Sequence, residues 1–215
     1  MGRPSRALLS RAAIAMAALD VVDESGPDGL TMRALADRLG VKAASLYNHV
    51  TGKDELLDSL AELVNAEIDL GPLEAPAGPS PLGWRTGVAE YARGYRAAFV
   101  RHPNTIALFA RRRVGAARQL LGYDALLAAL GRAGLDPAAA AEAAAALDYL
   151  VLGSALETFS AGFNRPAADY RPDYPALADS LEAAAGRGPG LDERGFELAL
   201  RLLLDGLAAR IAADR

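Results

Sequence analysis

One stretch of the sequence gathers side chains that could hydrogen-bond a nucleic acid. Residues 42–49, KAASLYNH, contain a lysine and four polar side chains and no acidic residue. Lysine and hydroxyl groups bind phosphates, while asparagine and small apolar side chains can contact base edges in the major groove. If this stretch is helical, its exposed face presents Lys42, Ala43, Ala44, Ser45, Tyr47, Asn48 and His49. That face predicts binding to double-stranded DNA.

Residues for other kinds of chemistry are scarce. The chain has no cysteine, which excludes a disulfide framework, a thiolate metal site and a cysteine nucleophile. Its two histidines stand far apart, at 49 and 102. There is no glycine-rich phosphate loop and no motif of a nucleophilic serine. We therefore expect no catalysis, no cofactor and no metal.

Charge is distributed unevenly. The net charge is -4, but residues 1–53 carry 7 basic and 5 acidic side chains, against 16 and 22 in residues 54–215. Residues 1–11 contain three arginines and no acid, as suits an arm that contacts the DNA backbone. Arg11 interrupts the early apolar run, and no segment has about 20 uncharged apolar residues in succession. We expect a cytoplasmic protein that does not bind membranes.

Helices must position these side chains. The chain of 215 residues is 52% hydrophobic but only 6% aromatic, and 48 residues are alanine, a strong helix former. No segment alternates as a strand does, so the expected fold class is all-α. Four helices are expected first, at about 5–25 with Ser5 as cap, 31–39, 42–49 and 51–69. The start of the fourth reads as a capping box, Thr51 to Asp54.

The segment 71–83, GPLEAPAGPSPLG, is rich in proline and glycine and marks a boundary. Further helices are expected at about 84–101, 104–113, 116–133, 137–163 and 192–213. A long loop with one short helix near 175–185 separates the last two. The predicted domains are a three-helix helix-turn-helix domain at 1–52, a linker helix at 53–70, the linker at 71–83, and a helical domain at 84–215.

The pattern at residues 30–57 is typical of a helix-turn-helix. Two short helices meet at Gly40, which can adopt the positive φ of a tight turn. Ala36 is small where the helices must cross closely. In such a motif the second helix enters the major groove. Two short helices joined by a glycine also occur in proteins that do not bind DNA. The prediction therefore depends on the combination of the glycine turn, the acid-free second helix, the Tyr-x-His sequence and a lysine at the start of the following helix.

The same stretch resembles the DNA-binding domain of the tetracycline-repressor (TetR) family of bacterial regulators. It fits the pattern LGV-x(4)-LY-x-HV-x-x-K-x-x-LL, and the order of the predicted parts is also similar. The resemblance implies a ligand-responsive transcriptional repressor that binds a palindromic operator as a homodimer and is released by a small-molecule inducer. It also implies a C-terminal domain for ligand binding and dimerisation.

The resemblance implies roles for individual residues. Arg33 would read a base, and Ala43 and Ala44 would meet thymine methyl groups or allow close approach. Lys53 would bind a phosphate at the start of its helix. The remaining phosphate contacts would come from Thr31, Ser45, Tyr47 and His49. Three simpler readings stay open: Arg33 as a solvated charge, Tyr47 as a core aromatic and His49 as an ordinary surface residue.

Twelve of the thirteen aromatic residues lie from Trp84 onward. Those on the 84–101 helix share one face, as in a core, but the resemblance favours a ligand cavity. Glu157 lies in the most apolar stretch, where a carboxylate needs a donor, a cation or solvent. The ligand-binding candidates are Tyr91, Tyr95, Phe99, His102, Phe109, Ser154, Glu157 and Thr158. Segment 104–118 lacks the histidine that binds magnesium in tetracycline repressors, so an uncharged or aromatic ligand is expected instead.

Two helices carry the features of a dimer interface. The 137–163 helix is apolar nearly all round, and the 192–213 helix carries a leucine-rich face. The alternative is that both are core helices of a monomer. The alternative function is an all-α small-molecule-binding enzyme or carrier without DNA binding. A third is an adaptor that holds another protein with its N-terminal helices.

Overall fold

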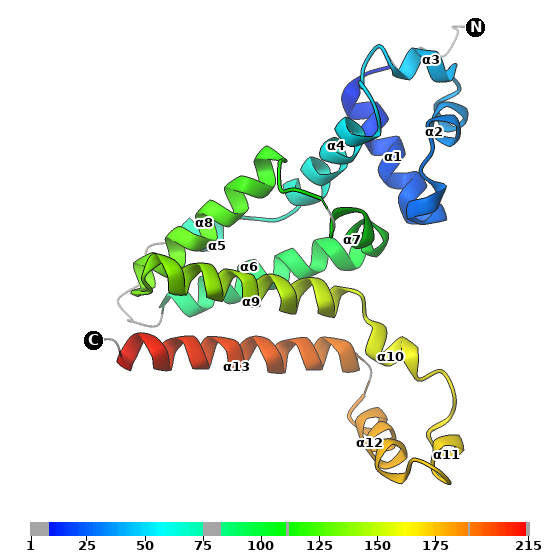
Figure 1. Ribbon diagram of the computed structural model, residues 1–215. Helices are drawn as coiled ribbons and strands as arrows, with labels where there is room; N and C mark the ends of the chain where they lie inside the picture. Colours follow the sequence, from blue (N-terminus) through cyan, green and yellow to red (C-terminus); the bar gives the residue numbers. More distant parts are fainter. Residues whose placement is uncertain (1–8, 75–82, 111, 189, 214–215) are drawn as a thin grey trace, which may run out of the picture.

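The computed structural model describes residues 9–74, 83–110, 112–188 and 190–213. Within these ranges the regular elements are all helical, which confirms the expected all-α class. Figure 1 shows α1–α3 at one end of the molecule and the long α6, α8, α9 and α13 at the other. The elements are α1 (Arg11–Ser25), η1 (Pro27–Gly29), α2 (Met32–Leu39), α3 (Ala43–Leu46), α4 (Lys53–Ala66), α5 (Gly71–Glu74), α6 (Gly83–Arg101), α7 (Pro103–Phe109), α8 (Ala117–Ala133), α9 (Pro137–Ala155), α10 (Thr158–Gly162), α11 (Ala167–Tyr170), α12 (Pro175–Gly186) and α13 (Leu191–Ala213).

The first helix begins later than expected. The Ser10 side chain accepts a hydrogen bond from the Ala13 amide (3.1 Å), so Ser10 is the N-cap of α1. The expected cap, Ser5, lies outside the described residues. The buried face of α1 packs against α2 and α4 and closes the N-terminal core with Ile14, Ala18 and Val22.

The turn between α2 and α3 depends on Gly40. Its φ is 65°, in the left-handed region, and the next amide, on Val41, donates to the Ala36 carbonyl (3.0 Å). At the other end of α2, Thr31 accepts from the Ala34 amide, as its expected capping role requires. The third helix is shorter than expected: it ends at Leu46, and residues 47–49 form a turn in which the amides of His49 and Val50 both donate to the Leu46 carbonyl.

Helix α4 belongs to two hydrophobic cores. Leu56 and Leu60 are buried with α1–α3, whereas Val64 is buried in the core of the C-terminal helices. The start of α4 is capped differently from the expectation. Glu55 rather than Asp54 reaches back, and its carboxylate accepts from the amide (2.6 Å) and hydroxyl (2.8 Å) of Thr51.

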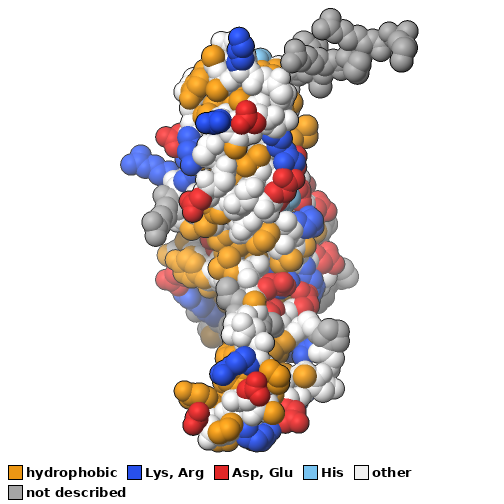
Figure 2. Space-filling model, turned by 90° about the vertical axis from the view of Figure 1, so that its right-hand side faces the viewer, with side chains coloured by type: hydrophobic (Ala, Val, Ile, Leu, Met, Phe, Trp, Pro, Cys, Tyr) orange, Lys and Arg blue, Asp and Glu red, His pale blue; other side chains and the backbone are white. Residues whose placement is uncertain are grey.

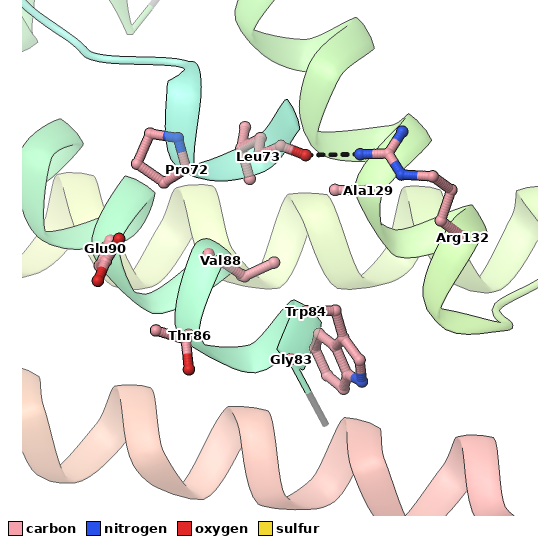
Figure 3. A pocket seen from close by; sticks show the side chains of 10 residues that line it. Pro72, Leu73, Gly83, Trp84, Thr86, Val88, Glu90, Ala129 and Arg132 are labelled. Carbon is pink, nitrogen blue, oxygen red and sulfur yellow. Dashed lines mark hydrogen bonds between the residues drawn. The ribbon is translucent and has the colours of Figure 1, made fainter. Parts of the chain in front are cut away.

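Part of the expected linker is docked on the C-terminal domain. Figure 3 shows Pro72 and Leu73 of α5 beside α6 and α8, around a cavity of about 140 Å³. The Arg132 side chain of α8 donates to the Leu73 carbonyl (2.5 Å). Gly87 permits the close approach, since a Cβ there would lie 2.2 Å from the Pro72 carbonyl oxygen. The segment 71–74 is therefore a packed element rather than a free tether.

The C-terminal core forms around α9, which packs against α6, α8 and α13. By length and composition alone α9 could cross a membrane, although no membrane-spanning helix is expected from the sequence. Its packing on three other helices is that of a core helix in a globular domain. Alanines at the points of contact let the helices approach closely.

The expected 137–163 helix is interrupted. It ends at Ala155, and Glu157 adopts a φ of 48°, which side-chain-bearing residues rarely adopt. Arg96 holds this corner, because it pairs with Glu157 (3.0 Å) and also with Glu193 at the start of α13. Beyond the corner, α10–α12 form an arm that projects from the body at its lower end (Figures 1 and 2).

We predict that Gly40→Ala destabilises the protein by about 1–2 kcal/mol, because the left-handed conformation is strained for any residue with a Cβ. No atom stands within 4 Å of the added Cβ, so the effect isolates the backbone. Gly94→Ala is the matched control, since Gly94 lies inside α6 with equally open space. That change should stabilise by about 0.5–1 kcal/mol. Urea unfolding would measure both; equal effects would contradict the account of the turn.

Candidate DNA interface and ligand cavity

The surface of α2 and α3 carries the residues expected to bind DNA. Buried Leu35, Ala36 and Leu46 join the two helices, so the opposite side of α3 faces solvent. Ser45 and His49 are half-buried, and the other expected contacts are exposed: Thr31, Arg33, Lys42, Ala43, Ala44, Tyr47, Asn48 and Lys53. This face combines cationic, hydroxyl, amide and imidazole groups without a carboxylate among residues 42–49.

Three details bear on the alternative readings. Tyr47 is 55% exposed, so it is not a core aromatic. The Arg33 side chain is 92% exposed, and its ion pair with Asp37 is long at 4.0 Å, so the guanidinium is available for another partner. Lys53 is the first residue of α4, where unpaired amides and the helix dipole favour a phosphate.

A cavity of about 320 Å³ lies in the C-terminal domain next to α4. Its aromatic walls come from four helices, and neighbouring rings are in contact, with centroids 5.3 Å apart for Tyr95 and Phe99 and 6.4 Å apart for Phe99 and Phe109. The lining residues are Asp58, Ala61, Tyr95, Phe99, Ile106, Phe109, Ala110, Arg112, Arg113, Val114, Gly115, Ala116, Gln119, Tyr123, Asp148, Tyr149 and Leu152. The size and apolar lining are those of a small-molecule site.

Asp148 is the polar centre of this cavity. Its Oδ1 accepts hydrogen bonds from the hydroxyls of Tyr95 (2.6 Å) and Tyr123 (3.2 Å). Burial and the nearby Asp148 charge raise the pKa of Tyr123 to about 12. The same two causes raise the pKa of Tyr95 above its ordinary value, with burial the larger. Both phenols therefore stay protonated and remain hydrogen-bond donors to the carboxylate at neutral pH.

Of the expected ligand residues, the structure brings Tyr95, Phe99 and Phe109 together in the cavity lining. Tyr91 is buried beside Tyr95 but is not among the lining residues. The Ser154 hydroxyl donates to the Val151 carbonyl, and Glu157 pairs with Arg96 outside the cavity. For Thr158 only the backbone is described. The cation expected beside the Glu157 carboxylate is therefore Arg96 of the protein itself.

His102 lies between the two domains rather than in the cavity. Its Nδ1 is 2.7 Å from Asp23 of α1, and its Nε2 is 3.0 Å from Glu67, just after α4. Burial alone would raise the pKa of Glu67, but hydrogen bonds from Arg101 and His102 outweigh it and lower that pKa. The adjacent Asn104 donates to the carbonyls of Val22 and Asp23. The start of α7 is therefore fastened to the end of α1.

The sequence reading missed the residues that give the cavity its polarity. Asp148 and Tyr149 lie in the same apolar stretch as Glu157, and an acid in an apolar helix was the available signal for both carboxylates. Hydrophobic periodicity could not decide which of the two carboxylates faces the cavity. Arg112 was missed because its partners, Asp54 (2.8 Å) and Asp58 (2.7 Å), lie on a distant part of the chain.

Comparisons with known proteins agree with this arrangement. The family profile described as "Bacterial regulatory proteins, tetR family" matches residues 14–60, and "Tetracyclin repressor-like, C-terminal domain" matches residues 77–211. The chain is 34% identical over 198 residues to the class A tetracycline repressor from transposon 1721 of Escherichia coli, covering 90% of this chain and 88% of that protein.

Solved structures extend the likeness to the whole fold. A possible TetR family regulator from Streptomyces coelicolor A3(2) superposes with a TM-score of 0.77 at 31% identity, covering 93% of this chain and 99% of that one. The protein ActR from Streptomyces coelicolor, solved in complex with actinorhodin, gives 0.75 at 28% identity, covering 94% and 97%.

We predict that Asp148→Asn weakens the dependence of stability on alkaline pH. A raised pKa means that the folded protein keeps the Tyr123 proton while the unfolded chain loses it near about pH 10, so stability falls between about pH 10 and 12. Removing the carboxylate charge lowers the folded-state pKa of Tyr95 and Tyr123 and flattens this fall. Urea unfolding across that range would measure it, with the exposed Asp124→Asn as control. An unchanged slope would contradict the assigned cluster.

Proposed function

We propose a mode of action that starts from the family of this chain. The chain belongs to the TetR family of bacterial transcription regulators and is a ligand-responsive transcriptional repressor. In our proposal it works in the cytoplasm, without catalysis, as a homodimer on a palindromic operator. A small molecule in the cavity beside α4 releases it from DNA. Residues 1–52 bind DNA, residues 53–70 link the domains, and residues 84–215 bind the ligand and the second subunit.

The proposed DNA binding rests on one observation, the exposed, acid-free face of α3. We assign α3 to the major groove, with Arg33 reading a base and Ala43 and Ala44 meeting bases closely. Lys42 and Asn48 also face the groove. The phosphate contacts are assigned to Thr31, Ser45, Tyr47, His49 and Lys53. The Thr31 hydroxyl caps α2 and can still donate its proton to a phosphate oxygen.

The dimer is proposed to form through the outward faces of α9 and α13. Tyr149 is 75% exposed, and Leu156, Leu198 and Leu202 are also exposed large apolar side chains. Solvent-facing leucines at a spacing of four residues on α13 form an apolar stripe that a second copy would cover. A two-fold axis then presents two α3 helices to successive major grooves, about 34–36 Å apart or a multiple of it.

Release follows from the position of the cavity. A ligand removes the repressor from DNA only if it binds the released conformation more tightly than the DNA-bound one. Asp58 and Ala61 of α4 line the cavity, and Phe109 of α7 lines it while packing against both hydrophobic cores. A ligand that shifts α7 or tilts α4 therefore changes the spacing of the two α3 helices. ActR, with actinorhodin bound, supports a ligand site in this fold.

The direct test is an electrophoretic mobility shift of the purified protein on the DNA upstream of its own gene. We expect a specific complex whose affinity falls steeply with salt, because the arm and Lys53 displace counterions from phosphates. Footprinting should reveal two symmetric half-sites. An enzyme or carrier of the same fold, the alternative function, would give neither a specific shift nor a steep salt dependence.

We predict that Arg33→Ala costs about 1–3 kcal/mol at one base position and relaxes preference there. Lys53→Ala should instead weaken binding to every sequence and lower the salt slope by about 1. Binding of both variants to a set of operator mutants at several salt concentrations separates the two roles. Identical profiles would contradict the assignment of a base-reading and a phosphate-binding residue.

We predict that Leu202→Glu converts the dimer into a monomer, because a charge would then face the apolar stripe of the second copy. Sedimentation velocity measures the change. Met16→Glu is the control, since Met16 is similarly exposed but lies on α1 in the DNA-binding domain. A Leu202→Glu variant that stays dimeric would show that α13 is not the interface.

A further inference from the structure

The carboxylate of Asp148 lies in the ligand cavity without a charge partner. Its Oδ1 accepts two phenol hydrogen bonds, and within the described ranges no hydrogen bond reaches Oδ2. No arginine, lysine or histidine of the described chain forms an ion pair with it. Two neutral donors satisfy one oxygen, but they leave the negative charge of the group uncompensated in a partly buried site.

The nearby cations are used elsewhere or lie at the rim. Arg112 pairs with Asp54 (2.8 Å) and Asp58 (2.7 Å), which fixes its charge at the α4 side of the cavity. Arg113 is exposed. Within the described residues, the negative charge of Asp148 in the cavity is therefore not met by an ion pair.

The walls around Asp148 suit an aromatic cation. Tyr95, Tyr123 and Tyr149 line the same cavity, and Phe99 adds a fourth ring. Faces of aromatic rings attract cations through their quadrupole, and this attraction strengthens when water is excluded. The volume of about 320 Å³ is near the lower end of ligand pockets, so the expected ligand is compact.

We propose that the ligand of this repressor is a compact molecule with an aromatic ring and an alkylamine side chain, whose protonated nitrogen forms a charge-assisted hydrogen bond with Asp148. This inference rests on the proposed function, since it names the ligand class of the same cavity. The aromatic part of the ligand lies against Phe99 and Phe109, and the ammonium group points towards Oδ2. The ligand thereby completes a group of three donors around one carboxylate: two phenols from the protein and one ammonium from the ligand.

The matched probes are two anthraquinones that differ in one group, an aminoethyl or a hydroxyethyl side chain, with a carboxymethyl analogue as the anionic member. Isothermal titration calorimetry of the full-length dimer measures the affinity of each. We expect the amine to bind at least about tenfold more tightly than the hydroxyl compound, a factor equivalent to about 1.4 kcal/mol. The anionic compound should bind most weakly.

Asp148→Asn should abolish the preference for the amine while the hydroxyl compound keeps its affinity within about threefold, because the amide has the same shape without the charge. Asp124→Asn, an exposed acid on α8 outside the cavity, is the matched control and should leave the preference intact. A melting temperature close to that of the wild type verifies that the Asp148→Asn variant is folded. Tyr123→Phe provides a second variant, which keeps the carboxylate and should retain the preference.

Three results would overturn the inference: equal affinity for the amine and hydroxyl probes, tighter binding of the anion, or no binding of any probe. None of them touches the proposed function, which is measured separately by binding to operator DNA without a ligand. Conversely, loss of specific DNA binding would remove the proposed function and leave the amine preference of Asp148 measurable.

Discussion

The structure depends on one shared helix. The first half of α4 buries Leu56 and Leu60 in the core of the DNA-binding domain, and its second half buries Val64 in the core of the C-terminal domain. Each buried leucine contributes about 1.5–3 kcal/mol, so neither domain can release α4 without losing a large part of its stability. Because Lys53 begins this helix and Asp58 and Ala61 line the cavity, the proposed phosphate contact and the proposed ligand site share one helix.

Helix α7 adds a second connection between the domains. At its start, His102 and Asn104 hold the end of α1, and at its end Phe109 joins the cavity lining to both cores. A ligand that moves Phe109 therefore acts on α1 and α4 at once. Coupling between distant sites needs an element with two arrangements that both sites bias, and α7 with α4 is the candidate for that element.

The sequence predicted the parts of the fold that local rules determine. The helix-turn-helix could be predicted from Gly40, Thr31 and the apolar positions of α2 and α3, because turn geometry, capping and periodicity are all local properties. The cavity depends on contacts between distant segments, and there the prediction was mixed. Tyr95, Phe99 and Phe109 line the cavity, whereas Glu157 pairs with Arg96 outside it and Asp148 faces the cavity instead.

The end of α9 was missed because the apolar composition continues past Ala155 while the backbone turns at Glu157. His102 was assigned to the ligand because no sequence rule reveals that Asp23 and Glu67 flank it.

The sharing of α4 between two cores is tested most directly by differential scanning calorimetry of the full chain, with and without operator DNA. If α4 unites the domains, the protein unfolds in a single cooperative transition, and the operator raises the temperature of that whole transition because it binds only the folded state. Two separate transitions, of which the operator shifts only one, would contradict the account, since the DNA-binding domain would then be stable independently of the core that holds the cavity.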